Sequence, residues 1–217
     1  MSNVHHLPQR ERAINLPPAT AILAGGLILI HLLRQALSPD LDDWVILNFA
    51  LIPARLTEMP LEPGAIATLF THMLLHGGWL HLIVNVGMLL AFAAALERLV
   101  GPWRMLLLAL LSGLGGAAIH VAIYAHDQSP MLGASGAISG LFGAMMLVAA
   151  QRQRSYRFLI GVTAIWLASN AALGLSGIPG QEDTIEIAWV AHVGGYVAGI
   201  AGMALLSARA RRNWRNR

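Results

Sequence analysis

A hydroxyl and an imidazole stand in separate apolar segments of this chain, each among small residues. Ser135 lies in a Gly-Ala-Ser-Gly run between Gly133 and Gly136. His192 opens a His-Val-Gly-Gly run that ends at Gly195. Such polar groups are costly within hydrocarbon and mark functional sites there. A neutral imidazole beside a hydroxyl can act as its general base. We therefore predict a serine nucleophile and its histidine base inside a membrane.

Each of these features has an ordinary structural explanation when it stands alone. Gly136, Gly140 and Gly143 also form a small-residue face of the kind that lets helices pack closely. His192 alone fits a structural histidine bonded to a backbone carbonyl. In the catalytic interpretation, the glycines permit a sharp turn before the serine. The free N–H groups at the helix start can then stabilise an oxyanion. We also expect Gly199 to help the two segments pack tightly.

A second group of polar residues opens another apolar segment. His81 and Asn85 are four residues apart and share one helix face. Both can donate hydrogen bonds to a developing negative oxygen, while polar contacts between helices are the alternative explanation. We expect His72, His76 and His81 to line a water-filled cavity. Solvation at the membrane interface is the simpler explanation, which we favour for His72.

The composition is that of a membrane protein. Of 217 residues, 56% are hydrophobic and only 12% are charged, against about 25% charged in soluble domains. There is no cysteine, which excludes disulfides and thiolate metal sites. All basic residues are arginines, mostly beside apolar segments, as at a cytoplasmic membrane surface. We predict no nucleic-acid partner, no metal and no cofactor.

Six apolar stretches are about long enough to cross a bilayer. We predict spans at 19–36, 79–96, 105–124, 134–150, 158–175 and 188–207. The fourth is short and rich in small residues, so it should be buried among the others. We expect no cleavable signal peptide, because the first eighteen residues are polar and end in two prolines. The domains are then a short tail at 1–18, the six-helix domain at 19–208 and a basic tail at 209–217.

The arginines predict the orientation of these spans. Six spans with both termini on one side place twelve arginines there and only Arg34 and Arg55 on the other. An excess of arginine marks the cytoplasmic side, so both termini should be cytoplasmic. The long connection at 37–78 is too apolar for a free linker. We expect it to be partly helical and to lie in the outer interface.

Three motifs together resemble the rhomboid family of intramembrane serine proteases, of the bacterial six-span type. The Gly-x-Ser-Gly run, the His-x-x-x-Asn pair preceded by His76, and the Ala-His-x-x-Gly run occur in the family's order. The resemblance covers about residues 19–208 and implies an all-α rhomboid-like bundle. It implies that Ser135 is the nucleophile and His192 its base, without an acidic third member. It also implies an oxyanion hole formed by Asn85, His81 and the backbone N–H of Ser135.

The resemblance further implies a serine endopeptidase that cleaves transmembrane segments near the outer face of a bacterial cytoplasmic membrane. Its partners would be membrane-protein substrates and the lipid bilayer. One position departs from the family, because Ser139 stands where many relatives carry an aromatic residue under the base. The main alternative is an inactive rhomboid-like protein that binds membrane clients. A haem- or ion-carrying protein is a further alternative, suggested by the histidines in or beside the spans: His31, His76, His81, His120 and His192.

Overall fold

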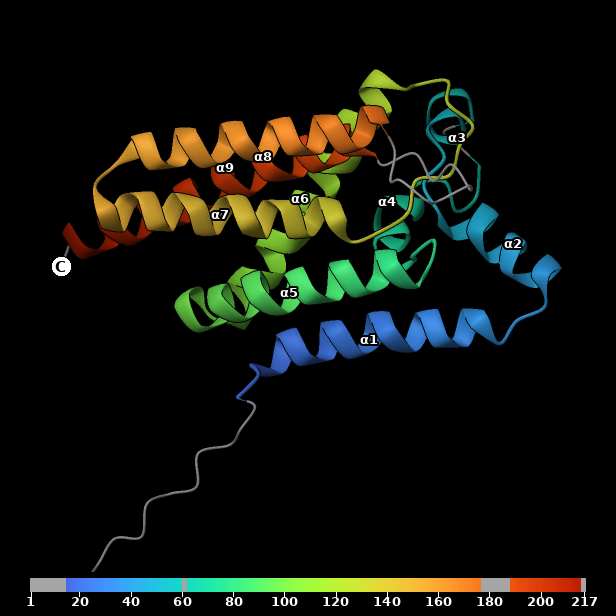
Figure 1. Cartoon of the computed structure of the whole chain (residues 1–217), viewed down its shortest axis with the longest axis horizontal. Helices are drawn as coiled ribbons and strands as arrows, with labels where there is room; N and C mark the ends of the chain where they lie inside the picture. The colour runs from blue at the N-terminus through green and yellow to red at the C-terminus, as the bar shows by residue number, and fades with distance from the viewer. Residues whose placement is uncertain (1–14, 60–61, 177–187, 216–217) are drawn as a thin grey trace, which may run out of the picture.

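The computed structural model describes residues 15–59, 62–176 and 188–215, which form a bundle of helices (Figure 1). All six predicted segments are helices whose bounds lie within a few residues of the prediction, except at the C-terminal end of the last. The six long helices are α1 (Pro18–Gln35), α5 (Trp79–Val100), α6 (Pro102–Ile123), α7 (Ser135–Gln153), α8 (Tyr156–Ser176) and α9 (Trp189–Arg215).

Local sequence explains several helix ends. Pro18 and Pro102 occupy the first position of α1 and α6, where a missing N–H costs nothing and the fixed φ suits a helix. Gly101 separates α5 from α6 with a φ of 85°, a conformation that favours glycine. Arg154 ends α7 in the left-handed region, and the N–H of Ser155 then bonds to the carbonyl of Ala150.

The connection between α1 and α5 is partly helical, which confirms that part of the prediction. It contains α2 (Pro39–Phe49), α3 (Pro53–Glu58), α4 (Thr68–Thr71) and the 3-10 helix η1 (His72–Leu74). These short elements gather at one end of the bundle, beside the end of α1 and the start of α5 (Figure 1). The same end holds the starts of α7 and α9, so the predicted site residues face a common region.

Helix α7 lies at the centre of the bundle, as its small residues predict. It contacts α5, α6, α8 and α9, and its larger buried apolar residues belong to the main core with residues of α1, α5, α6 and α9. In Figure 1, α1, α5, α7 and α8 follow one another side by side, each packed on the next. This central position makes α7 the scaffold on which the site is built.

The protein is an integral, multi-pass membrane protein. Four described helices are long and apolar enough to cross a membrane: α1, α5, α6 and the part of α9 at Trp189–Arg209. Their mean hydropathy is 1.3 to 2.1. Helix α7 is not among them, because glycines, serines and the polar Gln-Arg-Gln end lower its apolarity. Helix α8 is not among them either, so the six-span topology is taken up below as a proposal.

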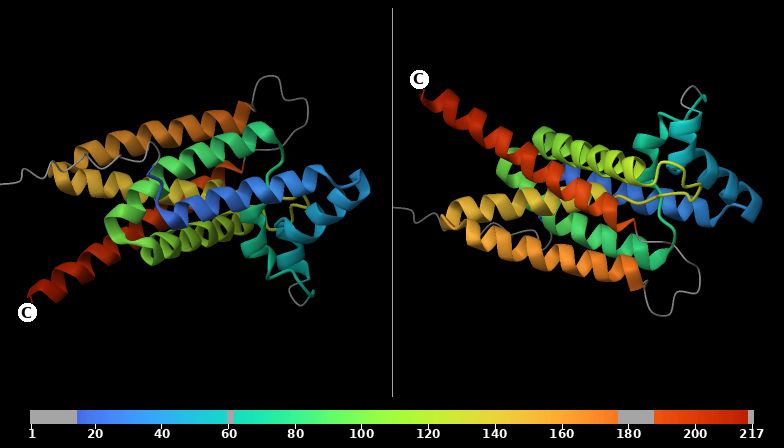
Figure 2. Two further views of the ribbon diagram at one scale, coloured as in Figure 1. Left: turned by 90° about the horizontal axis from the view of Figure 1, so that it is seen from below. Right: turned by 90° about the horizontal axis from the view of Figure 1, so that it is seen from above.

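Helix α9 continues beyond the end of its predicted span. It runs through the first part of the predicted basic tail to Arg215 and extends past its neighbours (Figure 2). The apolar stretch ends near residue 207. The helix continues beyond it because the alanines and arginines that follow are good helix formers. Most of the predicted N-terminal tail, residues 1–14, lies outside the described residues. So do residues 216–217 and three acidic residues of the last connection: Glu182, Asp183 and Glu186.

Candidate active site

Helices α7 and α9 meet backbone to backbone through their glycines. A Cβ atom added to Gly195 would lie 2.0 Å from the carbonyl oxygen of Gly136. One added to Gly199 would lie 2.0 Å from the carbonyl oxygen of Gly140. Only glycine permits this approach. The predicted close packing of the two segments is therefore confirmed, and it brings the starts of both helices together.

Backbone hydrogen bonds hold the segment that leads into α7. Met131 and Leu51 exchange two N–H to carbonyl bonds of 2.8 and 2.9 Å, and the N–H of Gly133 donates to the carbonyl of His72 at 2.9 Å. Gly133 has a φ of 126°, which side-chain-bearing residues rarely adopt. This turn makes Ser135 the first residue of α7. The first bond of the helix, from the N–H of Ile138 to the carbonyl of Ala134, leaves earlier N–H groups free to bind an anion.

Ser135 and His192 are in hydrogen-bond contact. The distance from Ser135 Oγ to His192 Nε2 is 2.7 Å. The other ring nitrogen, His192 Nδ1, is 2.7 Å from Oδ1 of Asn170 on α8. The sequence analysis did not single out Asn170. It could have been found as an amide side chain inside the apolar segment 158–175, because a polar side chain in such a segment marks a functional site or a contact between helices.

His81 approaches the serine from α5. A Cβ atom added to Gly133 would lie 2.9 Å from His81 Nε2 and 3.7 Å from Ser135 Oγ, so the ring and the hydroxyl flank this glycine. Asn85 is buried one turn further along α5, where its Nδ2 donates to the carbonyl of His81 at 2.8 Å. His81 and Ser135 thus both lie close to Gly133, whereas the Nδ2 atom of Asn85 donates within its own helix.

His72 and His76, which lie in the connection before α5, are buried, and this corrects one expectation. His72 is 3% exposed, and its Nδ1 lies 2.8 Å from the carbonyl oxygen of Thr68. Solvation at the interface is therefore wrong for His72, because the ring packs inside the connection between α1 and α5. Burial lowers the pKa of His72 to about 4. Burial also lowers the pKa of His76 to about 3. The His76 ring packs edge-on against the His81 ring, with ring centroids 5.1 Å apart.

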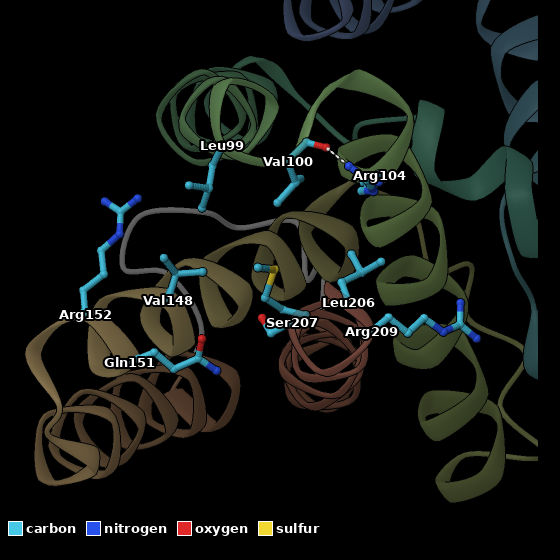
Figure 3. Close-up of a pocket in the computed structure, with 10 residues that line it drawn as sticks. Leu99, Val100, Arg104, Val148, Gln151, Arg152, Leu206, Ser207 and Arg209 are labelled. Carbon is cyan, nitrogen blue, oxygen red and sulfur yellow. Dashed lines mark hydrogen bonds between the residues drawn. The ribbon is translucent and has the colours of Figure 1, made fainter. Parts of the chain in front are cut away.

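A cavity of about 550 Å³ lies at the opposite end of the bundle (Figure 3). Arg104, Arg152 and Arg209 stand around an apolar lining that includes Val148 and Met203. These residues belong to the far ends of α7 and α9 and to the start of α6, away from Ser135 and His192. The cavity therefore does not serve the hydrogen-bonded pair. Within the described part of the chain, no group of three or more His, Asp or Glu side chains is arranged to hold a metal ion.

Comparisons with known proteins identify the family of the chain. The family model for the rhomboid domain matches residues 63–209, so the chain belongs to the rhomboid family. Members of this family are generally intramembrane serine proteases that act on membrane proteins within the bilayer.

Individual relatives are 32 to 40% identical to the chain over the aligned segments. It is 34% identical over 134 residues to RHOMBOID-like protein 4 of Arabidopsis thaliana, covering 61% of the chain and 32% of that protein. It is 32% identical over 138 residues to rhomboid protease GluP of Bacillus subtilis, covering 64% and 25%. A putative rhomboid protease of the same bacterium, YdcA, is 40% identical over 82 residues, covering 37% and 40%. The chain thus matches less than half the length of each of these relatives.

Proposed function

We propose that the chain is an intramembrane serine endopeptidase that cleaves transmembrane segments of membrane proteins. The observation that carries this proposal is the 2.7 Å contact between Ser135 Oγ and His192 Nε2. Membership of the rhomboid family supports it. We further propose that it acts near the outer face of a bacterial cytoplasmic membrane, because the contact lies at the bundle end opposite most of the arginines.

In this mechanism, His192 Nε2 takes the proton of Ser135 as Oγ attacks the carbonyl carbon of the scissile peptide bond. The imidazolium then gives this proton to the leaving amine, which breaks the C–N bond and leaves an acyl-enzyme. A water molecule, deprotonated by the same nitrogen, hydrolyses the ester and restores the serine. A substrate helix must unwind locally first, because helical peptide bonds are shielded.

The oxyanion of the tetrahedral intermediate needs donors that are already in place. The backbone N–H of Ser135 at the start of α7 supplies one in this proposal. His81 and Asn85 supply the others, because His81 lies beside the turn at Gly133 and Asn85 follows one turn later. Loss of one such donor lowers kcat about 100- to 1,000-fold in serine proteases.

A cleavage assay tests the proposal. The purified parent, Ser135→Ala and His192→Ala are compared on a reporter transmembrane segment in proteoliposomes. We expect both variants to lose activity about 1,000-fold or more, and a fluorophosphonate to label the parent but not Ser135→Ala. Ser169→Ala is the matched control, because this serine of α8 is exposed and its hydroxyl donates to the carbonyl of Ile165 in the same helix. A folded parent that binds the segment without cleaving it would instead support the client-binding alternative.

We also propose six spans with both termini in the cytoplasm. In support, the described arginines other than Arg34 and Arg55 gather at the bundle end formed by the ends of α5, α7 and α9 and the starts of α6 and α8. The cysteine-free chain allows a direct test with Gln128→Cys and Gln153→Cys, two exposed glutamines on either side of α7. An impermeant maleimide added to intact cells should label only the first. Labelling of both or neither contradicts a membrane crossing by α7.

A further inference from the structure

The side-chain amide of Asn170 makes one hydrogen bond through its nitrogen and one through its oxygen. Its Nδ2 donates to the carbonyl oxygen of Trp166, one turn earlier in α8, at 2.9 Å. Its Oδ1 is 2.7 Å from His192 Nδ1. Since a backbone carbonyl only accepts hydrogen bonds, the amide nitrogen must face Trp166 and the amide oxygen must face the imidazole.

This orientation determines the tautomer of His192. An amide oxygen only accepts hydrogen bonds, so the ring nitrogen facing Asn170 carries the proton. The neutral ring then leaves Nε2 without a proton, where it accepts the hydroxyl hydrogen of Ser135 at 2.7 Å. This is the form that a general base requires.

Contacts between α8 and α9 hold Asn170 at this distance. Trp166 stacks on Tyr196 with ring centroids 4.5 Å apart, and the Thr163 and Tyr196 hydroxyl oxygens are 2.6 Å apart. Tyr196 lies one turn after His192, and Trp166 lies one turn before Asn170. The two antiparallel helices are therefore pinned directly beside the amide–imidazole contact.

We propose that Asn170 is a positioning residue that holds His192 in the catalytic tautomer, so that the site is a Ser135–His192–Asn170 relay of hydrogen bonds. The inference rests on the proposed protease function and extends it beyond a serine–histidine pair. A neutral amide fills the corresponding place in Cys-His-Asn proteases. Here it also supports an imidazole that has Ser139 where many relatives have an aromatic residue.

Kinetics of three variants test the role of Asn170. Asn170→Leu removes the acceptor at similar volume, and we expect kcat to fall about 100-fold with KM unchanged. Fluorophosphonate labelling of Ser135 should slow in parallel. Asn170→Asp keeps an oxygen acceptor and should remain within about tenfold of the parent. Ser169→Ala, the adjacent control, should match the parent.

Two outcomes would overturn the inference. One is an Asn170→Leu variant that keeps its kcat within about threefold. The other is equal loss in the leucine and aspartate variants with an equally lowered melting temperature, which would show a structural role. If Ser135→Ala still cleaves, the protease proposal fails instead. Nitrogen-15 NMR of the His192 ring, assigned with His192→Ala, tests the tautomer without activity. A proton on Nδ1 in the parent supports the inference, and one on Nε2 contradicts it.

Discussion

Two sides of the bundle are held together by different physical means. The glycine side comprises α6, α7 and α9, where backbones are in direct contact. A Cβ atom added to Gly116 of α6 would lie 2.5 Å from the carbonyl oxygen of Ala191, close to the contacts of Gly195 and Gly199 with α7. Contacts of this kind depend on volume and shape and contain no titrating group.

The polar side comprises α1, α5 and the connection between them. Glu97 of α5 accepts hydrogen bonds from the N–H groups of Ala19 and Thr20 and from the Thr20 hydroxyl, and so caps the start of α1. Near the other end of α1, Arg34 forms two bonds with the Asp42 carboxylate and a third with the carbonyl of His76. Helix α1 is thus anchored near both ends by charged groups.

The difference shows how the site is divided. Ser135 and His192 belong to the glycine side, where close packing sets their distance. His81 and Asn85 belong to the polar side, and the two sides meet at the turn around Gly133. We therefore expect changes in volume to disrupt the glycine side and changes in charge to disrupt the polar side.

The largest effect is expected for Gly195→Ala. The added methyl group would lie 2.0 Å from a backbone oxygen, and such overpacking should lower the free energy of unfolding by about 3 kcal/mol. Thermal unfolding in detergent measures the loss of stability, and fluorophosphonate labelling measures the loss of reactivity at Ser135. The control is Gly26→Ala on α1, which has open space around it; alanine should change stability there by about 1 kcal/mol or less. Equal effects at both positions would refute the comparison.

A smaller effect is expected for Arg34→Met on the polar side. The arginine side chain is 7% exposed, and its partner Asp42 is 29% exposed. Removing the charge leaves a carboxylate partly buried and a carbonyl without its donor, which should cost about 2 kcal/mol. The measurement is again the melting temperature. Arg104→Met is the control, because the hydrogen bond described for this exposed arginine of α6 goes to the carbonyl of Val100, at the end of α5, and its loss should change stability by about 0.5 kcal/mol or less.

The smallest effect, when it is counted per pH unit, is a dependence of stability on pH that originates on the polar side. Burial lowers the pKa of His72 to about 4, so below pH 6.5 the unfolded chain binds a proton that the folded protein does not. The contribution of His72 to the free energy of unfolding is therefore fully present above pH 6.5. It falls by about 1.4 kcal/mol per pH unit as the pH decreases from 6.5 towards 4.

Melting temperatures at pH 7.0, 6.0 and 5.0 measure this decline. His72→Gln should make the decline less steep, because it removes the contribution of this one histidine to the slope. Gly195→Ala should be less stable at every pH but should decline with the same slope as the parent. A slope unchanged by His72→Gln would contradict the assignment to this ring.

Much of the architecture could be predicted from the sequence. The six helices follow from apolar length, and the buried position of α7 follows from its small residues. The approach of the Ser135 and His192 segments follows from Gly136 and Gly195. These features depend on local composition and spacing, which a linear chain displays directly.

Other features depend on which helix faces meet. The capping of α1 by Glu97 joins residues 77 and 78 positions apart, and the burial of His72 reflects folding of the connection around it. Neither has a local signature. Hydropathy also does not mark the end of the last helix, which continues past the predicted span to Arg215.

The amino-acid sequence by itself determined the helices, the membrane character and the pairing of a serine with a histidine. Apolar length, arginine placement and motif spacing are properties of the chain alone. Only the tertiary structure decided that the second ring nitrogen of His192 faces Asn170, because that contact requires α8 and α9 to pack at one particular rotation and depth. Hydrogen bonds act over about 3 Å, and only packing sets distances between helices that finely.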